Sequence, residues 1–360
     1  MDQPTLTMIP GPTPVRPEIL ESLGRPTVSH QDPDFVEDYR ACLADVAAIV
    51  RSGTAQPFVV SGSGTLAMEM ALVNLLGPED RLLVVSQGYF GDRWAQLAQA
   101  FGVRCELLQS EWGRAVAPET LAEALRRERF AAVAVTHVDT STGTAAPVEA
   151  YAGLLADREE LLLLDGVCAT AGIDERFDDW GVDVLVTGAQ KALGAPPGVA
   201  IAVVSQRALE RRRSRERVPA YSADLLRWLP VMRDPLTYFS TPPVNEIRAL
   251  ARATRMVLDE GLDERFARHR RLAASFREGL AALGLHVFTG TDCRADTLTV
   301  VRHAEGTDDE TFRRGMVGRG VVVAGGLGPV KGKVYRVGHM GNIGEAEIER
   351  TLSAIRASLG

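Results

Sequence analysis

Five short aliphatic runs between residues 80 and 205 constrain the fold of this chain more than any other feature. A strand that is apolar along its whole length is buried on both faces, as in a mostly parallel sheet covered by helices. Segments with helical periodicity alternate with these runs, so we expect an α/β fold that binds its ligands at the carboxyl ends of the strands. The runs are LLVV (82–85), AAVAV (131–135), LLLL (161–164), VLV (184–186) and VAIAVV (199–204).

Together with shorter strands at 58–61 and 103–108, these runs predict a mostly parallel, seven-stranded sheet in a large domain that spans residues 17–243. Residues 1–16 are rich in proline and lack periodicity, which predicts an extended N-terminal arm. We expect residues 244–360 to form a small C-terminal α/β domain with a long linking helix, which the arm can join. Its predicted helices cover 244–260, 263–283, 308–319 and 345–359, and its predicted strands cover 286–288, 297–301 and 334–337.

Composition excludes several classes of function. The net charge of −7 argues against a nucleic-acid partner, and the basic stretch 207–217 is expected to be a solvated helix face. No apolar run reaches the roughly 20 residues of a membrane span, and the N-terminus does not resemble a signal peptide. The four cysteines are widely spaced and the six histidines lack ligand spacing, so we expect a cytoplasmic protein without a metal.

A carboxylate and a lysine follow two neighbouring strands of the predicted sheet. Asp165 ends the run LLLLD, and Lys191 follows the strand in VDVLVTGAQK. Pyridoxal 5′-phosphate (PLP) needs a lysine to form a Schiff base with its aldehyde and a carboxylate to keep its ring nitrogen protonated. The pair therefore predicts a PLP site. The alternative, in which Lys191 is an ordinary surface lysine, leaves the buried carboxylate unpaired.

A glycine-rich turn joins the strand in FVVSGSGT (58–65) to a helix. Glycines let the backbone N–H groups and the helix N-terminus face an anion, and the hydroxyls of Ser63 and Thr65 can add donors to a phosphate. A plain strand–helix turn is the alternative interpretation.

Other strand ends carry residues that suit the same cofactor. Phe90, after the strand RLLVVS, can stack on a pyridine ring, although core packing is the usual role of such an aromatic residue. Val167 can cover the second face of the ring. The hydroxyls in HVDTSTG (137–143) can bond the phenolic oxygen, or can belong to a solvated turn.

Arg336 lies within the apolar strand of GKVYRVGHMG. A guanidinium can bind a carboxylate through two parallel hydrogen bonds, which predicts a substrate-binding role. A structural salt bridge is the alternative.

Taken in order, these motifs resemble those of the class V, fold-type I PLP-dependent aminotransferases, specifically the alanine–glyoxylate and serine–pyruvate branch. The resemblance covers nearly the whole chain. It runs from GPTP through SGSGTLAMEMALVN, THVDTSTG, LLLLDGVCA, TGAQKALGAPPG and GGLGP to the strand of Arg336.

The resemblance implies a role for each matching residue. Lys191 and Asp165 become the Schiff-base lysine and the pyridinium partner, and either Thr140 or Ser141 reaches the phenolic oxygen. Tyr238 and Thr241 become phosphate ligands of the neighbouring subunit, which makes the enzyme a homodimer with shared active sites. The remaining implied residues are the phosphate ligands Ser63, Gly64, Thr65 and Gln190, the ring contacts Phe90 and Val167, and the substrate-binding Arg336 and Gly11.

The implied reaction is ping-pong transfer of an amino group from a small amino acid, alanine or serine, to glyoxylate or pyruvate. TPPVNEI and RVGHMG also resemble pyridoxamine–pyruvate aminotransferase, and His339 is a candidate substrate contact in that case. A PLP-dependent lyase such as a cysteine desulfurase is less consistent with the sequence. Gln190 stands where a histidine is expected, and Cys293 is the one loop cysteine that can be argued for as a nucleophile.

Overall fold

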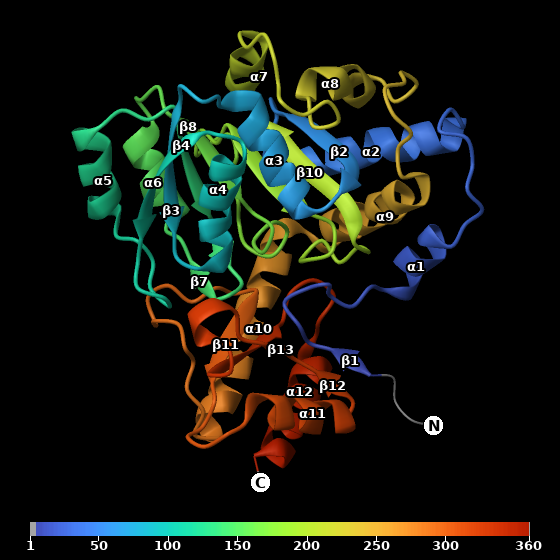
Figure 1. Cartoon of the computed structure of the whole chain (residues 1–360). Helices are drawn as coiled ribbons and strands as arrows, with labels where there is room; N and C mark the ends of the chain where they lie inside the picture. The colour runs from blue at the N-terminus through green and yellow to red at the C-terminus, as the bar shows by residue number, and fades with distance from the viewer. Residues whose placement is uncertain (1–4, 360) are drawn as a thin grey trace.

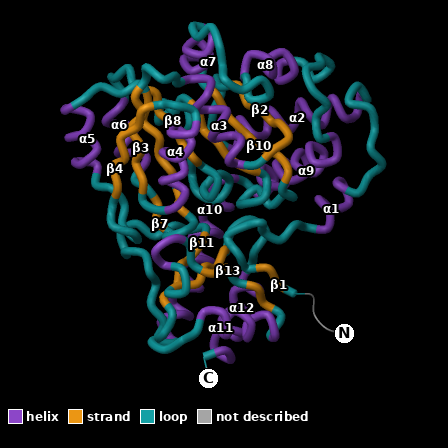
Figure 2. The backbone as a smooth tube through the Cα atoms, in the orientation of Figure 1, coloured by secondary structure: helices purple, strands orange, loops and turns teal. Residues whose placement is uncertain are grey.

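The structure, a computed structural model, describes residues 5–359, and its two largest sheets each pack against their own helices (Figure 1). The strands of the larger sheet lie side by side in the upper part of the molecule, with helices around them (Figure 2). The smaller sheet lies below it, with the C-terminal helices. Within the described residues, none of the helices combines the length and hydropathy needed to cross a bilayer.

The large sheet has seven strands in the order β2-β10-β9-β8-β5-β3-β4. The strands from β9 to β4 pair in parallel, and β10 runs antiparallel between β9 and β2. The mostly parallel, seven-stranded sheet expected from the sequence is therefore confirmed. Its strands are β2 (Gln56–Gly62), β3 (Arg81–Ser86), β4 (Arg104–Gln109), β5 (Ala132–Thr136), β8 (Leu161–Asp165), β9 (Val184–Gly188) and β10 (Gly198–Val204).

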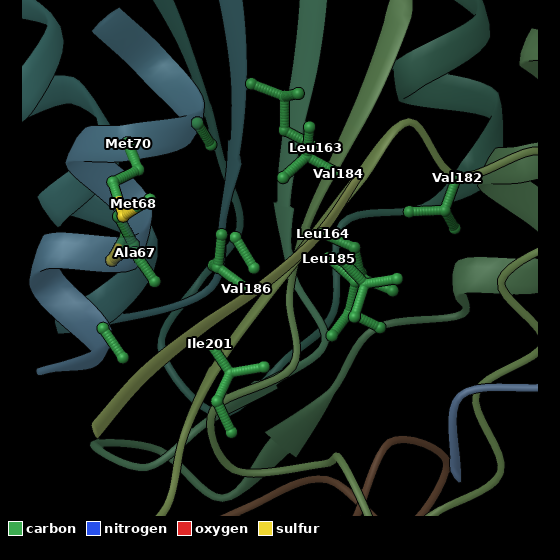
Figure 3. Close-up of a cluster of buried hydrophobic side chains, with 14 of the residues drawn as sticks. Ala67, Met68, Met70, Leu163, Leu164, Val182, Val184, Leu185, Val186 and Ile201 are labelled. Atoms are coloured by element: carbon green, nitrogen blue, oxygen red, sulfur yellow. The ribbon is translucent and has the colours of Figure 1, made fainter. Parts of the chain in front are cut away.

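Within residues 5–359, nine helices precede α10, and most of them pack around the large sheet. Figure 3 shows Ala67, Met68 and Met70 of one helix beside strand residues such as Val186 and Ile201. Burial on both faces explains why the central strands are apolar at every position. These helices are α1 (Pro17–Leu23), α2 (Pro33–Ile49), α3 (Gly64–Leu75), α4 (Tyr89–Ala100), α5 (Pro118–Arg127), α6 (Val148–Leu155), α7 (Gln206–Arg213), α8 (Leu225–Arg233) and α9 (Val244–Glu260).

A second hydrophobic core lies around the small sheet, whose three strands have the order β11-β14-β13. The N-terminal segment joins this part, because β1 (Leu6–Thr7) pairs in parallel with β12 (Val321–Val322) and Met8 is buried in the same core. The other elements are α10 (Leu262–Ala282), β11 (Leu298–Arg302), α11 (Asp309–Gly318), β13 (Ala324–Gly325), the 3-10 turn η1 (Gly328–Val330), β14 (Val334–Gly338) and α12 (Glu345–Ser358). A short hairpin, β6 (Val138–Asp139) and β7 (Thr144–Ala145), follows β5.

The first core includes residues of α9, so α9 packs with the large sheet although it lies after residue 243. The division of the chain into 1–16, 17–243 and 244–360 stays a prediction, which the two separate cores support. Residues 1–4 of the expected arm lie outside the described residues.

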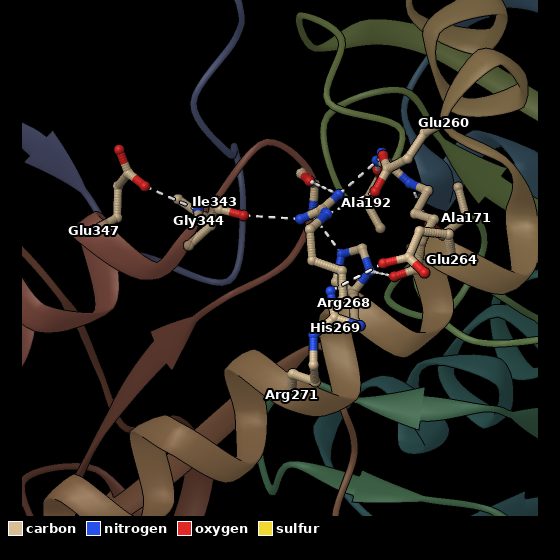
Figure 4. A network of polar contacts seen from close by, with 12 residues as sticks. Ala171, Ala192, Glu260, Glu264, Arg268, His269, Arg271, Ile343, Gly344 and Glu347 are labelled. Carbon is tan, nitrogen blue, oxygen red and sulfur yellow. Dashed lines mark hydrogen bonds and ion pairs between the residues drawn. The ribbon is translucent and has the colours of Figure 1, made fainter.

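Arg265 and Arg268 of α10 hold the two parts of the chain together. Figure 4 labels Arg268 with its partners Glu260 and Ile343. Arg265 is buried and donates to the carbonyl oxygens of Ala171 and Ala192, in the loops after β8 and β9. Arg268 donates to the carbonyl oxygen of Ile343 at 2.8 Å, and both arginines bind the carboxylate of Glu260. This network fixes the residue after Lys191 relative to the small sheet.

Two expectations need correction, and one helix was not expected. The basic stretch 207–217 is not simply a solvated face, because Arg212 is buried against Asp224 and Arg211 binds Asp80. The strand expected at 286–288 is reduced to a single bridge between Val287 and Val301. Helix α8 was not among the predicted elements, and it contains Pro230, a residue that usually interrupts a helix.

Candidate active site

A cavity of about 160 Å³ lies where the strands of the large sheet end. Nine of its lining residues are predicted site residues, from the ends of β2, β3, β5, β8 and β9. They are Ser63, Gly64, Thr65, Phe90, Thr140, Asp165, Val167, Gln190 and Lys191. Sequence reasoning gave no role in the site to the other four, which are Met68, Arg93, Val138 and Cys168.

One end of the cavity is the N-terminus of α3. Ser63 is the N-cap residue, and its side chain makes no capping hydrogen bond, so the first N–H groups of the helix are left for another acceptor. A Cβ at Gly64 would lie 2.7 Å from Val167 Cγ2, so only glycine lets the helix approach Val167 this closely. Gln190 also lines the cavity, and the NH₂ group of its side chain can donate to an anion. This end of the cavity suits an anion such as a phosphate.

Asp165 is buried and accepts two hydrogen bonds from the part of the chain that the structure describes. Val167 N–H donates to Oδ1 at 2.9 Å, and the hydroxyl of Thr136 donates to Oδ2 at 3.3 Å. Burial raises the pKa of Asp165 to about 7, with Asp139 adding to the rise and the two donors opposing it. A protonated ring nitrogen beside this carboxylate would supply the missing donor and positive charge, and would lower its pKa.

Lys191 reaches into the cavity from the loop after β9 and meets the N-terminal arm. Its Nζ donates to the carbonyl oxygen of Pro10, and Thr13 Oγ1 donates to the carbonyl oxygen of Lys191 at 2.8 Å. Gly11 has φ +119°, and a Cβ there would lie within 2.7 Å of three side-chain atoms of Lys191. Glycine is therefore required for the arm to pass directly over the lysine.

The turn after β5 separates the two hydroxyl candidates. Ser141 is fully buried, donates to Asp139 Oδ1 at 2.6 Å and accepts from Tyr89 N–H at 2.9 Å, and it does not line the cavity. Thr140 does line the cavity. The structure thus places Ser141 in a supporting position and leaves Thr140 as the hydroxyl that can reach a bound ring.

Asp139 holds the start of α4 in place. Its Oδ2 accepts from the backbone N–H groups of Phe90 and Gly91, both at 2.9 Å. Burial raises the pKa of Asp139, and hydrogen bonds from Ser141, Gly91 and Phe90 oppose the rise. A carboxylate at a helix N-terminus is favoured by the helix dipole, so Asp139 fixes the helix that carries Phe90.

Arg336 approaches from the small sheet. Its Nε donates to the carbonyl oxygen of Gly325 at 2.7 Å, and its Nη1 lies 3.4 Å from the carbonyl oxygen of Thr140. Burial lowers the pKa of Arg336, and none of the ion pairs among residues 5–359 involves it. A half-buried guanidinium that lacks a carboxylate partner, next to a cavity-lining residue, is suited to an anionic ligand.

Other predicted residues lie away from the cavity. Tyr238 is exposed, and its hydroxyl lies 3.3 Å from that of Thr241. His339 is fully buried in the small part of the chain and bonds the hydroxyl of Thr299 at 2.9 Å. Cys293 is buried and donates to the carbonyl oxygen of Gly113 at 3.5 Å, so it is not on an accessible loop.

A lysine and a buried carboxylate at adjoining strand ends of a mostly parallel sheet define the fold-type I class of PLP enzymes. The family model for class-V aminotransferases matches residues 18–360, and this chain belongs to that family. PLP is the cofactor of the family, and the anion-binding end of the cavity, Asp165 and Lys191 fit its phosphate, ring nitrogen and aldehyde.

Known relatives and solved structures are similar to this chain over nearly its full length. An uncharacterized aminotransferase of Methanocaldococcus jannaschii is 36% identical over 98% of this chain and 92% of its own length. Alanine–glyoxylate aminotransferase 1 of Saccharomyces cerevisiae is 34% identical over 93% and 91%. The pyridoxamine–pyruvate transaminase of Mesorhizobium japonicum is 31% identical over 94% and 87%. The crystal structure of alanine–glyoxylate aminotransferase from Nostoc sp. has a TM-score of 0.96 at 30% identity and covers 100% of this chain and 96% of that one.

Proposed function

We propose that this aminotransferase moves the amino group of a small amino acid, with alanine or serine favoured, to glyoxylate or pyruvate by a ping-pong mechanism. The observation that carries the proposal is that Asp165 and Lys191 line one cavity, with the unpaired Arg336 beside it. PLP, when bound, supplies an aldehyde for the amino group and a ring that takes up the electron pair of the substrate α-carbon.

Each residue then has a defined task. Lys191 would hold the aldehyde between turnovers, and its amine, once freed, would move the proton of the substrate α-carbon to carbon C4′ of the cofactor. Asp165 would hold the proton on the ring nitrogen, and the hydroxyl of Thr140 would donate to the phenolic oxygen. Arg336 binds the α-carboxylate shared by the amino acid and the 2-oxo acid, which explains how one site serves both substrates.

The size of the substrate follows from the arm. Pro10 and Gly11 lie directly on the side chain of Lys191, so little room is left beside the reacting amine. Small donors fit this arrangement better than long ones. We infer that Gly11 contacts the substrate and limits its side chain.

The proposal includes a homodimer with shared active sites. Tyr238 and Thr241 are exposed and lie together outside the cavity of their own chain, as phosphate ligands for a partner subunit would. Exposed Tyr221 and Leu236 lie in the same stretch and suit a subunit contact. We also propose a cytoplasmic location, because all four cysteines are free thiols.

The visible absorbance of the purified holoenzyme tests this function. Addition of L-alanine or L-serine should convert the aldehyde form of the cofactor to the amine form, and glyoxylate or pyruvate should restore it. Arg336→Gln should lower kcat/KM for both substrates by about 10²-fold, because a charge-assisted bidentate contact is lost. A different result would favour the pyridoxamine–pyruvate type of reaction instead: free pyridoxamine acts as the amino donor, and Arg336→Gln leaves the KM for pyridoxamine unchanged.

A further inference from the structure

Arg93 lines the cavity but has no part in the proposed reaction. It lies on α4 three residues after Phe90, so the two side chains share one face of the helix. Its guanidinium carbon lies 4.9 Å from the centre of the Phe90 ring and 5.4 Å from that of Tyr89. Its Nη1 donates to Thr65 Oγ1 at 3.1 Å.

The hydrogen bond to Thr65 has a fixed direction. A guanidinium is a donor only, so the Thr65 hydroxyl must accept from Arg93. The hydroxyl proton is then left free to be donated elsewhere. Because Thr65 lies in the first turn of α3, that proton adds to the N–H groups that face the anion-binding end of the cavity.

The positive charge needed to bind a phosphate in the cavity also points to Arg93. A phosphate monoester carries a charge of about −1.5 to −2 at neutral pH, whereas a helix N-terminus supplies only about +0.5. The cationic residues that line the cavity are Lys191 and Arg93, and Lys191 bonds the arm at Pro10 and is assigned to the aldehyde. None of the ion pairs within residues 5–359 involves Arg93, so its charge is not neutralised by a carboxylate.

We propose that Arg93 is a positioning residue for the cofactor phosphate: it orients the Thr65 hydroxyl as a donor and supplies the positive charge that α3 lacks. The inference rests on the proposed placement of PLP with its phosphate at the N-terminus of α3. The stacking on Phe90 keeps the guanidinium beside Thr65 and gives the contact a defined geometry.

Comparison of PLP with pyridoxal tests this role, because pyridoxal keeps the ring and aldehyde but lacks the phosphate. Equilibrium binding of both to the cofactor-depleted protein is measured by absorbance, for wild type and Arg93→Gln. We expect Arg93→Gln to weaken PLP about 10-fold and to change pyridoxal binding less than about 2-fold. Arg302→Gln is the matched control, since Arg302 also stacks on an aromatic ring, Phe288 at 4.6 Å, but lies in the small part of the chain.

The mechanism through Thr65 is tested separately. In a Thr65→Val background the PLP-specific effect of Arg93→Gln should shrink, because the hydroxyl that Arg93 orients is gone. Arg93→Lys keeps the charge and should retain part of the PLP preference, and it serves as the test variant if Arg93→Gln does not fold.

Three outcomes would overturn the inference. The first is equal weakening of PLP and pyridoxal binding by Arg93→Gln, which would mean that Arg93 acts only through Phe90. The second is that Arg93→Gln weakens the binding of neither ligand. The third is that Arg93→Lys loses the whole preference for PLP. Failure of the wild-type protein to prefer PLP over pyridoxal would contradict the proposed placement of the cofactor itself, so the two failures are distinguishable.

Discussion

Asp139 and Asp165 are both buried carboxylates at the carboxyl edge of the large sheet, but their surroundings differ. Asp139 accepts four hydrogen bonds, from the N–H groups of Phe90, Gly91 and Ser141 and from the Ser141 hydroxyl. Asp165 accepts two, from Val167 and Thr136. The comparison shows that a carboxylate whose acceptor sites are all occupied by protein donors supports the fold. A carboxylate with unoccupied acceptor sites is available to a ligand.

The largest expected effect is a loss of activity that distinguishes Asp165 from Asp139. Asp165→Asn should lower kcat by about 10²-fold or more, because a neutral amide cannot hold the ring nitrogen in its protonated form. Steady-state turnover and unfolding of the cofactor-depleted protein by denaturant are the measurements. A variant that loses stability but keeps its turnover would show that Asp165 is structural, like Asp139.

The pH dependence of stability gives the next largest contrast. The pKa of Asp165 is raised from 3.8 to about 7, so between these values the folded protein holds a proton that the unfolded chain has lost. The free energy of unfolding should therefore fall as pH rises through this window, and Asp165→Asn should remove that part of the slope. Parallel pH profiles of the two cofactor-depleted proteins would contradict the prediction.

Asp139→Asn should act mainly on stability. Each carboxylate oxygen of Asp139 now accepts from two donors. Asparagine has one oxygen and one NH₂ group, so the donors that meet the NH₂ group, at least one of them a backbone N–H, lose their acceptor. We expect a loss of about 2 kcal/mol in the free energy of unfolding. Urea denaturation of the cofactor-depleted variant measures it. Asp165→Asn is the control, because its amide oxygen can still accept from Val167 N–H and its NH₂ group can donate to the hydroxyl of Thr136.

The smallest effects distinguish the two neighbouring hydroxyls. Ser141→Ala should cost about 1 kcal/mol of stability, because it removes one donor to Asp139 and the acceptor for Tyr89 N–H. Thr140→Ala should leave stability nearly unchanged and shift the absorbance of the bound cofactor instead. The reverse pattern would place Ser141, not Thr140, against the phenolic oxygen.

The strand ends of the large sheet could be predicted from the sequence because local rules determine them. Continuous apolar runs identify the parallel strands, and parallel strands bring Ser63, Asp165 and Lys191 to one edge without knowledge of any distant contact. The same reasoning gave a cluster of hydroxyls at 137–143, and the family resemblance reduced it to Thr140 or Ser141. The choice between these two depends on where the Asp139 side chain points.

Other features depend on packing between distant segments. The side chain of Lys191 meets the arm at Pro10, about 180 residues earlier in the chain, and Arg336 meets the backbone of Thr140 across the two parts of the molecule. Arg93 carried one local signal, its position three residues after Phe90, which was not used. The two-residue strands of the small part gave no periodic pattern to recognise.

Chemical trapping of the cofactor tests the central claim most directly. The chain contains three lysines, Lys191, Lys331 and Lys333, and only Lys191 lines the cavity. Borohydride reduction of the purified holoenzyme, followed by peptide mass spectrometry, should place the phosphopyridoxyl group on the peptide that contains Lys191. Attachment at Lys331 or Lys333, or no attachment when PLP is in excess, would contradict the account.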